Sequence, residues 1–254
     1  MAKIVVFDSG LGSLSIILAI QKISKSEIIY FADQENFPYG GKSYTQLSKI
    51  IQKSIKVLHE KFNPDIIVMA SNTPSIMLNL ATKKIIDVKP PLKDAQKKSK
   101  TKQVAILTTN SAVKSKGLAL YIRQNNFPKK IKILKINGSD LVELVESGKF
   151  HTDKKYCKKI IKKVLDQELF ENNIDVILLS STHLPFLRLL LEKEYPKISF
   201  IDPANEVAKK VLLKIKDKQN KRNSLKIFAS GNFVTFQRKL DRIGIKNKVN
   251  FLSI

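Results

Sequence analysis

Two clusters of small polar side chains stand at matched places in the sequence, each directly after an apolar run. Residues 71–73 read Ser-Asn-Thr and follow the run at 65–70, and residues 181–183 read Ser-Thr-His and follow the run at 174–180. If the runs are strands, both clusters lie at carboxyl ends, where open α/β sheets bind ligands. Serine, histidine and an acid are also the residue types of a hydrolase triad, but no G-x-S-x-G motif is present. Capping of the next helix is the alternative for either cluster.

A third candidate is the segment at 8–12, Asp-Ser-Gly-Leu-Gly, which follows the apolar run at 3–7. Glycines let backbone N–H groups approach an anion, and a helix N-terminus favours negative charge. A dinucleotide site is one alternative, because Asp33 lies near the acidic position of that motif, but Ser15 replaces its third glycine. A helix N-cap is another alternative for Asp8.

Three further positions carry weaker signals. The segment at 37–43, Phe-Pro-Tyr-Gly-Gly-Lys-Ser, is either a turn with an aromatic anchor or a donor of backbone amides and Ser43 to a carboxylate. Thr109 follows the apolar run at 103–108. Glu146 ends a helical pattern just before a glycine, as a surface glutamate would.

No metal or cofactor site is predicted. The three histidines are scattered without an H-x-x-x-H spacing, and Cys157 is the only cysteine. His59 lies in an amphipathic pattern and His151 in a connection, so we expect both to be structural. The single cysteine also excludes an intramolecular disulfide.

The elements that must position these residues alternate along the chain. Unbroken apolar runs such as 66–69 and 176–179 are typical of strands covered on both faces of a parallel sheet. Amphipathic stretches separate them, so the pattern predicts βαβ units and an α/β fold, with polar connections at 89–102 and 214–223. We expect strands at 3–7, 28–32, 65–70, 103–108, 131–136, 174–180, 198–202 and 224–229, and helices at 12–24, 44–61, 74–86, 112–125, 139–147, 153–171, 184–195 and 203–217.

The composition is that of a globular protein with an unusual charge. Hydrophobic residues make up 43%, and no apolar run approaches the ~20 residues of a membrane span, so we expect no membrane association. The N-terminal residues do not read as a secretory signal, and the cytoplasm is the expected compartment. The formal net charge of +24 is almost all lysine at helical spacing, which favours a solvated helix face over a nucleic-acid interface. Such a field would attract an acidic substrate.

In their order along the chain, these segments resemble glutamate racemase and the wider aspartate/glutamate racemase superfamily. The resemblance runs through most of the chain and depends on the segments together rather than on any one of them. They are D-S-G-x-G at Asp8, a P-Y-G-like segment at Pro38, x-N-T at Ser71, Thr109 with Lys114-Ser115, V-E at Val145-Glu146, x-T-H-x-P at Ser181 and D-P at Asp202-Pro203.

The resemblance implies two pseudo-symmetric α/β domains with mostly parallel sheets and a ligand site at the interdomain cleft. We expect the first domain at 1–92 plus 206–254 and the second at 93–205. The family reaction is cofactor-independent racemisation of glutamate or aspartate, in which one base removes the α-proton and another returns a proton to the opposite face. Family proteins are often homodimers, so a homodimer is expected. The implied catalytic residues are Ser71, Ser181, Asp8, His183 and Glu146, and the implied substrate-binding residues are Ser9, Pro38, Tyr39, Gly40, Asn72, Thr73, Thr109 and Thr182.

Serine stands at both positions where the resemblance implies a catalytic cysteine. The family's A-C-N-T reads Ala-Ser-Asn-Thr at 70–73, its G-C-T-H-Y-P reads Ser-Ser-Thr-His-Leu-Pro at 180–185, and a usual second threonine after Thr109 is Ala112. A thiol has a pKa near ~8.5, whereas an aliphatic hydroxyl lies nearer the ~15.7 of water. The gap is roughly five to seven pKa units, or about 7–10 kcal/mol at ~1.4 kcal/mol per unit, so serine is a poor standing base. Cys157 lies outside every motif and is a poor substitute.

Three hypotheses follow from this departure. In the first, an acidic amino acid binds between the halves but is not efficiently racemised, and the protein is a pseudoenzyme, sensor or binding protein. In the second, a residual or altered enzyme uses Asp8 and His183 directly for proton transfer, or uses the serines for another reaction. In the third, the serines are engineered into an ordinary racemase, although the accompanying Ser180 and Leu184 favour natural drift.

Overall fold

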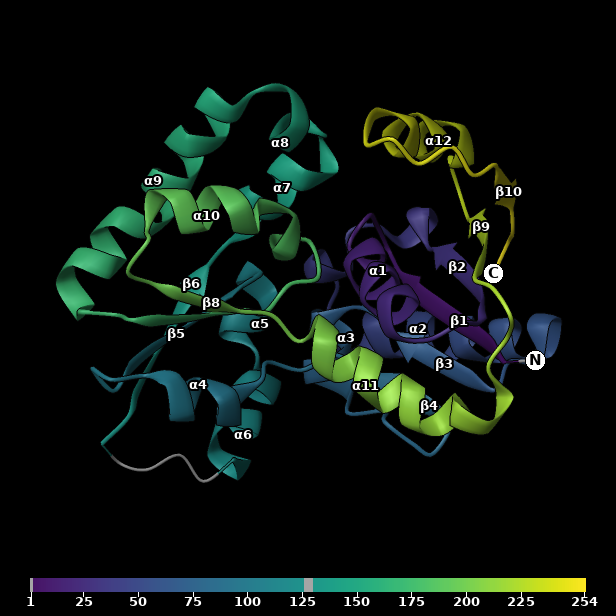
Figure 1. The fold of residues 1–254 in the computed structure, drawn as a ribbon, viewed down its shortest axis with the longest axis horizontal. Helices are drawn as coiled ribbons and strands as arrows, with labels where there is room; N and C mark the ends of the chain where they lie inside the picture. Colours follow the sequence, from purple (N-terminus) through teal and green to yellow (C-terminus); the bar gives the residue numbers. More distant parts are fainter. Residues whose placement is uncertain (1, 126–129) are drawn as a thin grey trace. The chain divides into compact units, whose positions relative to one another are not determined.

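The computed structural model describes residues 2–125 and 130–254 of the chain (Figure 1). The contacts within it divide the chain into two compact units. Unit 1 joins the two ends of the chain, Met1–Val88 and Ala204–Ile254, and unit 2 is the continuous segment Lys89–Pro203. Among the described residues, no helix combines the length and the hydropathy that crossing a membrane requires.

Unit 1 is built on one parallel sheet. Its strands are β1 (Lys3–Asp8), β2 (Glu27–Ala32), β3 (Ile66–Met69), β4 (Ile85–Asp87), β9 (Ser224–Ala229) and β10 (Val249–Phe251). They pair in the order β10-β9-β2-β1-β3-β4, and each of these pairs is parallel. The helices are α1 (Ser13–Ile23), α2 (Tyr44–Phe62), α3 (Asn72–Leu78), α11 (Ala204–Ile215) and α12 (Phe233–Arg242), with 3-10 turns η1 (Gln34–Asn36), η2 (Tyr39–Gly41) and η4 (Lys216–Lys218).

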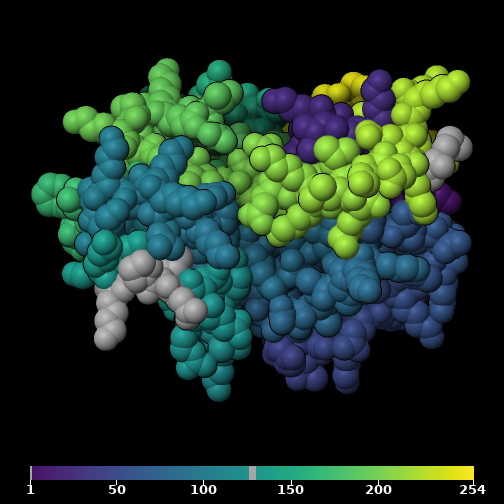
Figure 2. Space-filling view, turned by 60° about the horizontal axis from the view of Figure 1, so that its bottom comes forward, coloured from purple at the N-terminus to yellow at the C-terminus, as the bar shows by residue number. Residues whose placement is uncertain are grey.

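Both faces of this sheet are buried, as the unbroken apolar runs predict. Phe7 of β1 belongs to one hydrophobic cluster with Leu47 and Ile51, which recur at helical spacing on α2. Val6, on the opposite face of the same strand, is also fully buried. Helix α11 packs against α1, and its exposed side forms part of the surface of unit 1 (Figure 2). The carboxyl ends of the strands are thereby held on a rigid frame.

Unit 2 repeats this architecture on a smaller sheet. Its strands are β5 (Gln103–Thr108), β6 (Lys132–Asn137), β7 (Val176–Leu179) and β8 (Ser199–Ile201), which pair in parallel in the order β6-β5-β7-β8. Cys157, Ile161 and Leu165 recur every four residues on one helix and lie in the core with residues of β5 and β7. The helices are α4 (Leu92–Lys98), α5 (Asn110–Lys114), α6 (Lys116–Gln124), α7 (Ser139–Glu146), α8 (Lys149–Thr152), α9 (Lys154–Asn172) and α10 (Arg188–Glu194), with the 3-10 turn η3 (Leu184–Leu187).

The two sheets share a strand order and a hydrogen-bond frame. The order β2-β1-β3-β4 in unit 1 corresponds to β6-β5-β7-β8 in unit 2. Past the third strand of each set, the N–H of Ala70 donates to the carbonyl of Phe7 at 2.8 Å, and the N–H of Ser180 donates to the carbonyl of Leu107 at 2.8 Å. Ser71, the residue after Ala70, therefore corresponds in topology to the residue after Ser180.

The correspondence extends to the amino ends of the same strands. Asn63 ends α2 and Asn173 ends α9, both in the left-handed conformation that asparagine tolerates, at φ 42° and 48°. Two residues later, the carboxylate of Asp65 accepts from the N–H of Lys3, and that of Asp175 accepts from neighbouring backbone N–H groups. The same helix end and the same acid therefore precede β3 and β7.

Three expectations about local structure were wrong. The helix expected at 74–86 ends at Leu78, because Asn79 adopts a left-handed conformation, and β4 follows it. The stretch at 89–102, expected to be a polar connection, contains α4. The helix expected at 112–125 is two helices, because Ser115 caps the N-terminus of α6 with its side chain.

Candidate functional site

The first candidate residue in unit 1, Asp8, is the last residue of β1 and is 2% exposed. Its carboxylate accepts a hydrogen bond from the N–H of Ser9 at 2.7 Å. The helix N-cap interpretation of Asp8 was wrong, since α1 begins at Ser13 with Gly12 as the N-cap and no side-chain cap. A buried carboxylate therefore stands at the carboxyl end of the sheet.

Ser71, Asn72 and Thr73 lie at the end of the neighbouring strand β3, and all three are buried. Ser71 is the N-cap residue of α3, but its hydroxyl makes no capping bond. The amide of Asn72 donates to the carbonyl of Val88 at 3.2 Å, while its oxygen is buried with no hydrogen-bond partner among the described residues. Buried acceptors of this kind are rare in native proteins, so the Asn72 oxygen is a candidate acceptor for a ligand.

The Pro38-Tyr39-Gly40 segment lies beside the same edge. The N–H of Tyr39 donates to the hydroxyl of Ser9 at 3.3 Å. The Tyr39 ring is fully buried, and burial together with the charges of Asp33 and Asp8 raises the pKa of its hydroxyl well above the usual value. Pro38 is exposed, and Gly40 is partly buried in η2.

Asp33 is a component of this site that the sequence analysis did not assign. It is fully buried, and its carboxylate accepts hydrogen bonds from the hydroxyls of Tyr39 at 2.9 Å and Ser230 at 2.8 Å. The amide of Asn36 donates to the same carboxylate at 3.0 Å. These bonds occupy the carboxylate, which argues against the dinucleotide alternative. The position of Asp33 at the end of β2 was the available signal.

The candidates of unit 2 form a connected chain of side chains. The hydroxyl of Ser181 lies 3.4 Å from Nδ1 of His183, and Nε2 of His183 lies 2.7 Å from Oε1 of Glu146. The exposed fractions of the three residues are 5%, 7% and 2%. The expectation that Glu146 is a surface residue was wrong: it ends α7, but that helix end turns the side chain toward the histidine.

The remaining site candidates of unit 2 are two threonines. Thr109 follows β5, is partly buried, and lies 3.3 Å from the hydroxyl of Ser111. Thr182 is 2% exposed and stands between Ser181 and His183. Both therefore lie at the carboxyl edge of the second sheet, just after the paired strands β5 and β7.

Other residues singled out from the sequence have structural roles. Ser43 forms a capping box with Gln46 at the start of α2, so its hydroxyl is used there. Ser115 caps α6, and Asp202 accepts from Arg188 at 3.2 Å. Cys157 is buried on α9, where burial raises the pKa of its thiol, so it is a poor base.

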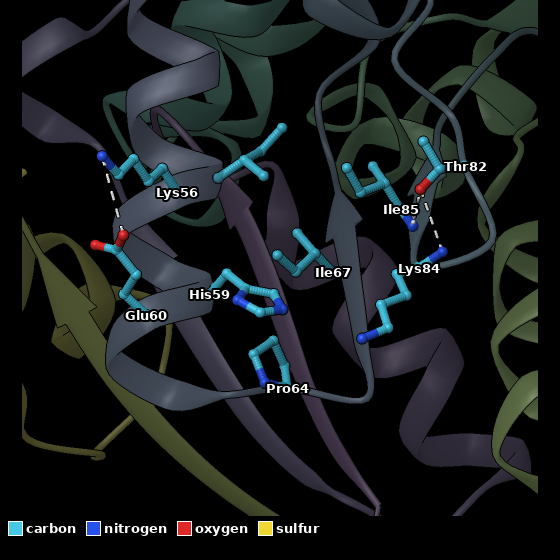
Figure 3. Close-up of a pocket in the computed structure, with 9 residues that line it drawn as sticks. Lys56, His59, Glu60, Pro64, Ile67, Thr82, Lys84 and Ile85 are labelled. Carbon is cyan, nitrogen blue, oxygen red and sulfur yellow. Dashed lines mark hydrogen bonds and ion pairs between the residues drawn. The ribbon is translucent and has the colours of Figure 1, made fainter.

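The other two histidines lie away from both clusters. His59 of α2 and Ile67 line a cavity of about 330 Å³ with an apolar floor, and the histidine ring points toward Ile67 (Figure 3). His151 lies in α8 rather than in a connection, and it packs against Phe150. In the described part of the chain, no group of three or more histidine, cysteine or acidic residues could hold a metal ion.

The lysine-rich face of α9 is exposed to solvent, as its spacing predicted. The lysines at 154, 155, 159 and 162 are all exposed. Lys158 pairs with Glu194 at 2.9 Å, and Lys163 with Asp140 at 3.0 Å. These six lysines therefore lie on the outside of α9 and do not enter the core of unit 2.

Comparisons with known proteins place the chain in one family. No family model matches the sequence. A glutamate racemase from Actinobacillus pleuropneumoniae is 31% identical over 219 residues, which cover 82% of this chain and 79% of that protein. The crystal structure of glutamate racemase RacE1 from Bacillus anthracis has a TM-score of 0.84 at 22% identity and covers 100% of this chain and 98% of its own.

A second solved structure shares the fold. Glutamate racemase from Escherichia coli, in complex with L-glutamate and the activator UDP-MurNAc-Ala, has a TM-score of 0.80 at 22% identity and covers 99% of this chain and 98% of its own. The α/β fold predicted from the apolar runs, with the two mostly parallel sheets that the resemblance implied, is confirmed by these structures. The chain therefore belongs to the glutamate racemase family.

Proposed function

We propose that the protein binds glutamate or aspartate and racemises it poorly. The observation that carries the proposal is the matched position of Ser71 and Ser181, each of which follows the residue that donates to the central strand at 2.8 Å. In a two-base racemase, groups at these positions would lie on opposite faces of the α-carbon. Here both groups are hydroxyls, which are too weakly acidic to supply a standing base.

The nature of the ligand follows from the family and from the site residues. The relative from Escherichia coli was crystallised with L-glutamate, which supports an acidic amino acid as the ligand here. The buried oxygen of Asn72 suits an ammonium group, which is a pure donor. The hydroxyls of Ser9, Thr73, Thr109 and Thr182 and the backbone of Gly40 suit the two carboxylates. The net charge of +24 would raise the local concentration of such an anion.

A residual enzymatic function is the second candidate, and one observation favours it. His183 is hydrogen-bonded to Glu146 at 2.7 Å, and Asp8 lies buried at the matched edge of unit 1. A paired imidazole can act as a general base near neutral pH, whereas a serine cannot. In this case His183 and Asp8 would exchange the α-proton directly.

Deuterium exchange separates these possibilities. The protein is incubated with L- and D-glutamate and with L- and D-aspartate in deuterated water, and deuterium at the α-carbon is measured by mass spectrometry. Calorimetry measures binding in parallel. Binding without deuterium supports a binding protein or pseudoenzyme, and deuterium incorporation supports the residual enzyme. If none of these amino acids binds, the proposed function is wrong.

The proposal also concerns the cellular compartment and the oligomeric state of the protein. We place the protein in the cytoplasm as a homodimer, without a nucleic-acid or membrane partner, on the basis of the family resemblance and the dispersed lysine charge. Light scattering after gel filtration tests the dimer. A monomer at micromolar concentration would contradict it.

A further inference from the structure

Three of the candidate residues in unit 2 are also arranged for a second kind of chemistry. A hydroxyl, an imidazole and a carboxylate follow one another in Ser181, His183 and Glu146, with contacts of 3.4 Å and 2.7 Å. All three are at least nine-tenths buried. They come from two segments that fold together, the turn after β7 and the end of α7. A nucleophile next to a base that is oriented by a third group is the arrangement of covalent acyl-transfer catalysis.

The proton positions in this chain follow from its chemistry. An ionised carboxylate can only accept hydrogen bonds, so the His183 nitrogen that faces Glu146, Nε2, carries the proton. In the neutral imidazole the other ring nitrogen, Nδ1, is the acceptor, and it faces the Ser181 hydroxyl. The contact of 3.4 Å is long, but nucleophile–base contacts are often looser before substrate binds.

We propose that Ser181 is an acyl-accepting nucleophile toward small carboxylic esters, with His183 as its base and Glu146 as the group that orients the base. The Ser181 oxygen attacks the ester carbonyl and forms a new C–O bond while its proton passes to Nδ1 of His183. The bond to the alcohol breaks, and the departing oxygen takes that proton. Water then attacks the acyl-serine through the same base, which releases the carboxylic acid and restores the hydroxyl.

This role distinguishes Ser181 from the other serines of the same frame. Ser71 holds the matched position in unit 1, but two residues later the chain has Thr73 where unit 2 has His183. Ser180 is adjacent in sequence, and its hydroxyl is buried without a partner among the described residues. A serine acts as a nucleophile only with an adjacent base, so only Ser181 is expected to react.

The probe is p-nitrophenyl acetate, with the full chain as the enzyme. We expect a burst of nitrophenol that approaches one equivalent per chain, followed by slow turnover, and peptide mass spectrometry should locate the acetyl group on Ser181. Ser71 in the same sample serves as an internal comparison and should carry none. Acetyl on lysines or on other serines without Ser181 would overturn the proposal.

Four variants make the test specific. Ser181→Ala should abolish the burst, and His183→Gln should slow it by about 100-fold or more, the usual contribution of a general base. Glu146→Gln should slow it less, since the amide can still accept from the imidazole. Ser180→Ala removes a hydroxyl one residue away and should leave the burst unchanged. Circular dichroism and urea unfolding establish that each variant is folded.

Ser181 and His183 also belong to the proposed amino-acid site, but all three residues lie in unit 2 and the burst is measured without an amino acid. A protein that binds glutamate but gives no burst, or the same burst in Ser181→Ala, refutes the acyl-transfer proposal and leaves the proposed function intact. A protein that gives the burst but binds no acidic amino acid refutes the proposed function instead. Each of the two inferences can therefore be refuted while the other stands.

Discussion

The carboxyl edges of the two sheets have the same backbone frame but different proton chemistry. In unit 1 the residues at this edge are Asp8 and Ser71, and the hydroxyl of Ser71 makes no capping bond. In unit 2 Ser181 lies next to His183, which is held by Glu146. Equivalent strand ends thus carry a carboxylate in unit 1 and a histidine paired with a carboxylate in unit 2. The shared fold determines the backbone positions of these residues, and the side chain at each position determines its chemistry.

The largest expected effect comes from restoring thiols at both edges. Ser71→Cys with Ser181→Cys should raise the racemisation of glutamate by about 10²–10⁴-fold, the range of a well-placed general base. Each single variant should raise α-proton exchange of mainly one enantiomer, which would show that the two edges serve opposite faces. The measurement is circular dichroism of the amino acid together with deuterium incorporation. Equal effects of both single variants on both enantiomers would refute the two-sided comparison.

The second prediction compares how much His183 and the matched Thr73 contribute to the free energy of unfolding. His183→Leu removes the partner of a buried carboxylate and should lower the free energy of unfolding by about 3 kcal/mol or more, measured in urea. The matched substitution in unit 1, Thr73→Val, removes only a hydroxyl and should cost about 1 kcal/mol.

The double variant His183→Leu with Glu146→Leu is the control for the histidine variant. It should recover part of the loss, because no buried charge remains. A double variant as unstable as the sum of both single losses would show that the two residues do not act as a pair.

The third prediction concerns the Asp33 network of unit 1. Tyr39→Phe removes one donor to a buried carboxylate and should destabilise the protein by about 1–3 kcal/mol. Because the Tyr39 backbone also contacts Ser9, glutamate should bind more weakly in calorimetry. Tyr44→Phe, on an exposed tyrosine of the next helix, is the control and should have neither effect.

The smallest effects are expected at the amino ends of β3 and β7, where Asp65 of unit 1 and Asp175 of unit 2 hold matched positions. Burial alone would raise the pKa of Asp175 and of Asp65, but hydrogen bonds outweigh it, from Ser99 and backbone N–H groups in one case and from Lys218 and Lys3 in the other. The pKa of each is therefore lowered from its usual 3.8.

A lowered pKa in the folded state stabilises the protein above the usual value and loses that effect as the pH falls through the folded value. Asp175→Asn and Asp65→Asn should each cost about 1 kcal/mol at pH 7 and reduce the loss of stability below pH 3.8, in urea titrations. A large loss of stability in only one of the two variants would show that the amino ends of the two sheets differ, as their carboxyl ends do.

The sequence predicted the frame better than the side-chain contacts. Apolar runs such as 66–69 and 176–179 indicated buried strands, because a strand covered on both faces has no polar positions. The sequence did not predict β4 and β10. Both are edge strands of three residues, which is too short for a recognisable apolar pattern. The candidate residues Asp8, Ser71 and Ser181 were singled out because each follows an apolar run in the sequence.

The pairings of those residues were not predictable, because they join positions far apart in the chain. Glu146 reads as a surface residue in its own helix, and only packing brings it to a histidine 37 positions away. Asp33 likewise bonds Ser230, 197 positions away. Periodicity describes local structure and contains no information on such long-range contacts.

The chain order of the two units has a consequence for synthesis on the ribosome. Unit 2 is continuous, so all of its strands have been made once residue 203 is in place. Unit 1 begins first but finishes last, because β9 pairs with β2 and Ser230 completes the shell of Asp33. Domains generally fold as units during translation, so the later-starting unit matures first. The hydrogen bonds around Asp33 and Tyr39 are therefore complete only when nearly the whole polypeptide has been made, and a nascent chain that stops before β9 lacks the bond from Ser230.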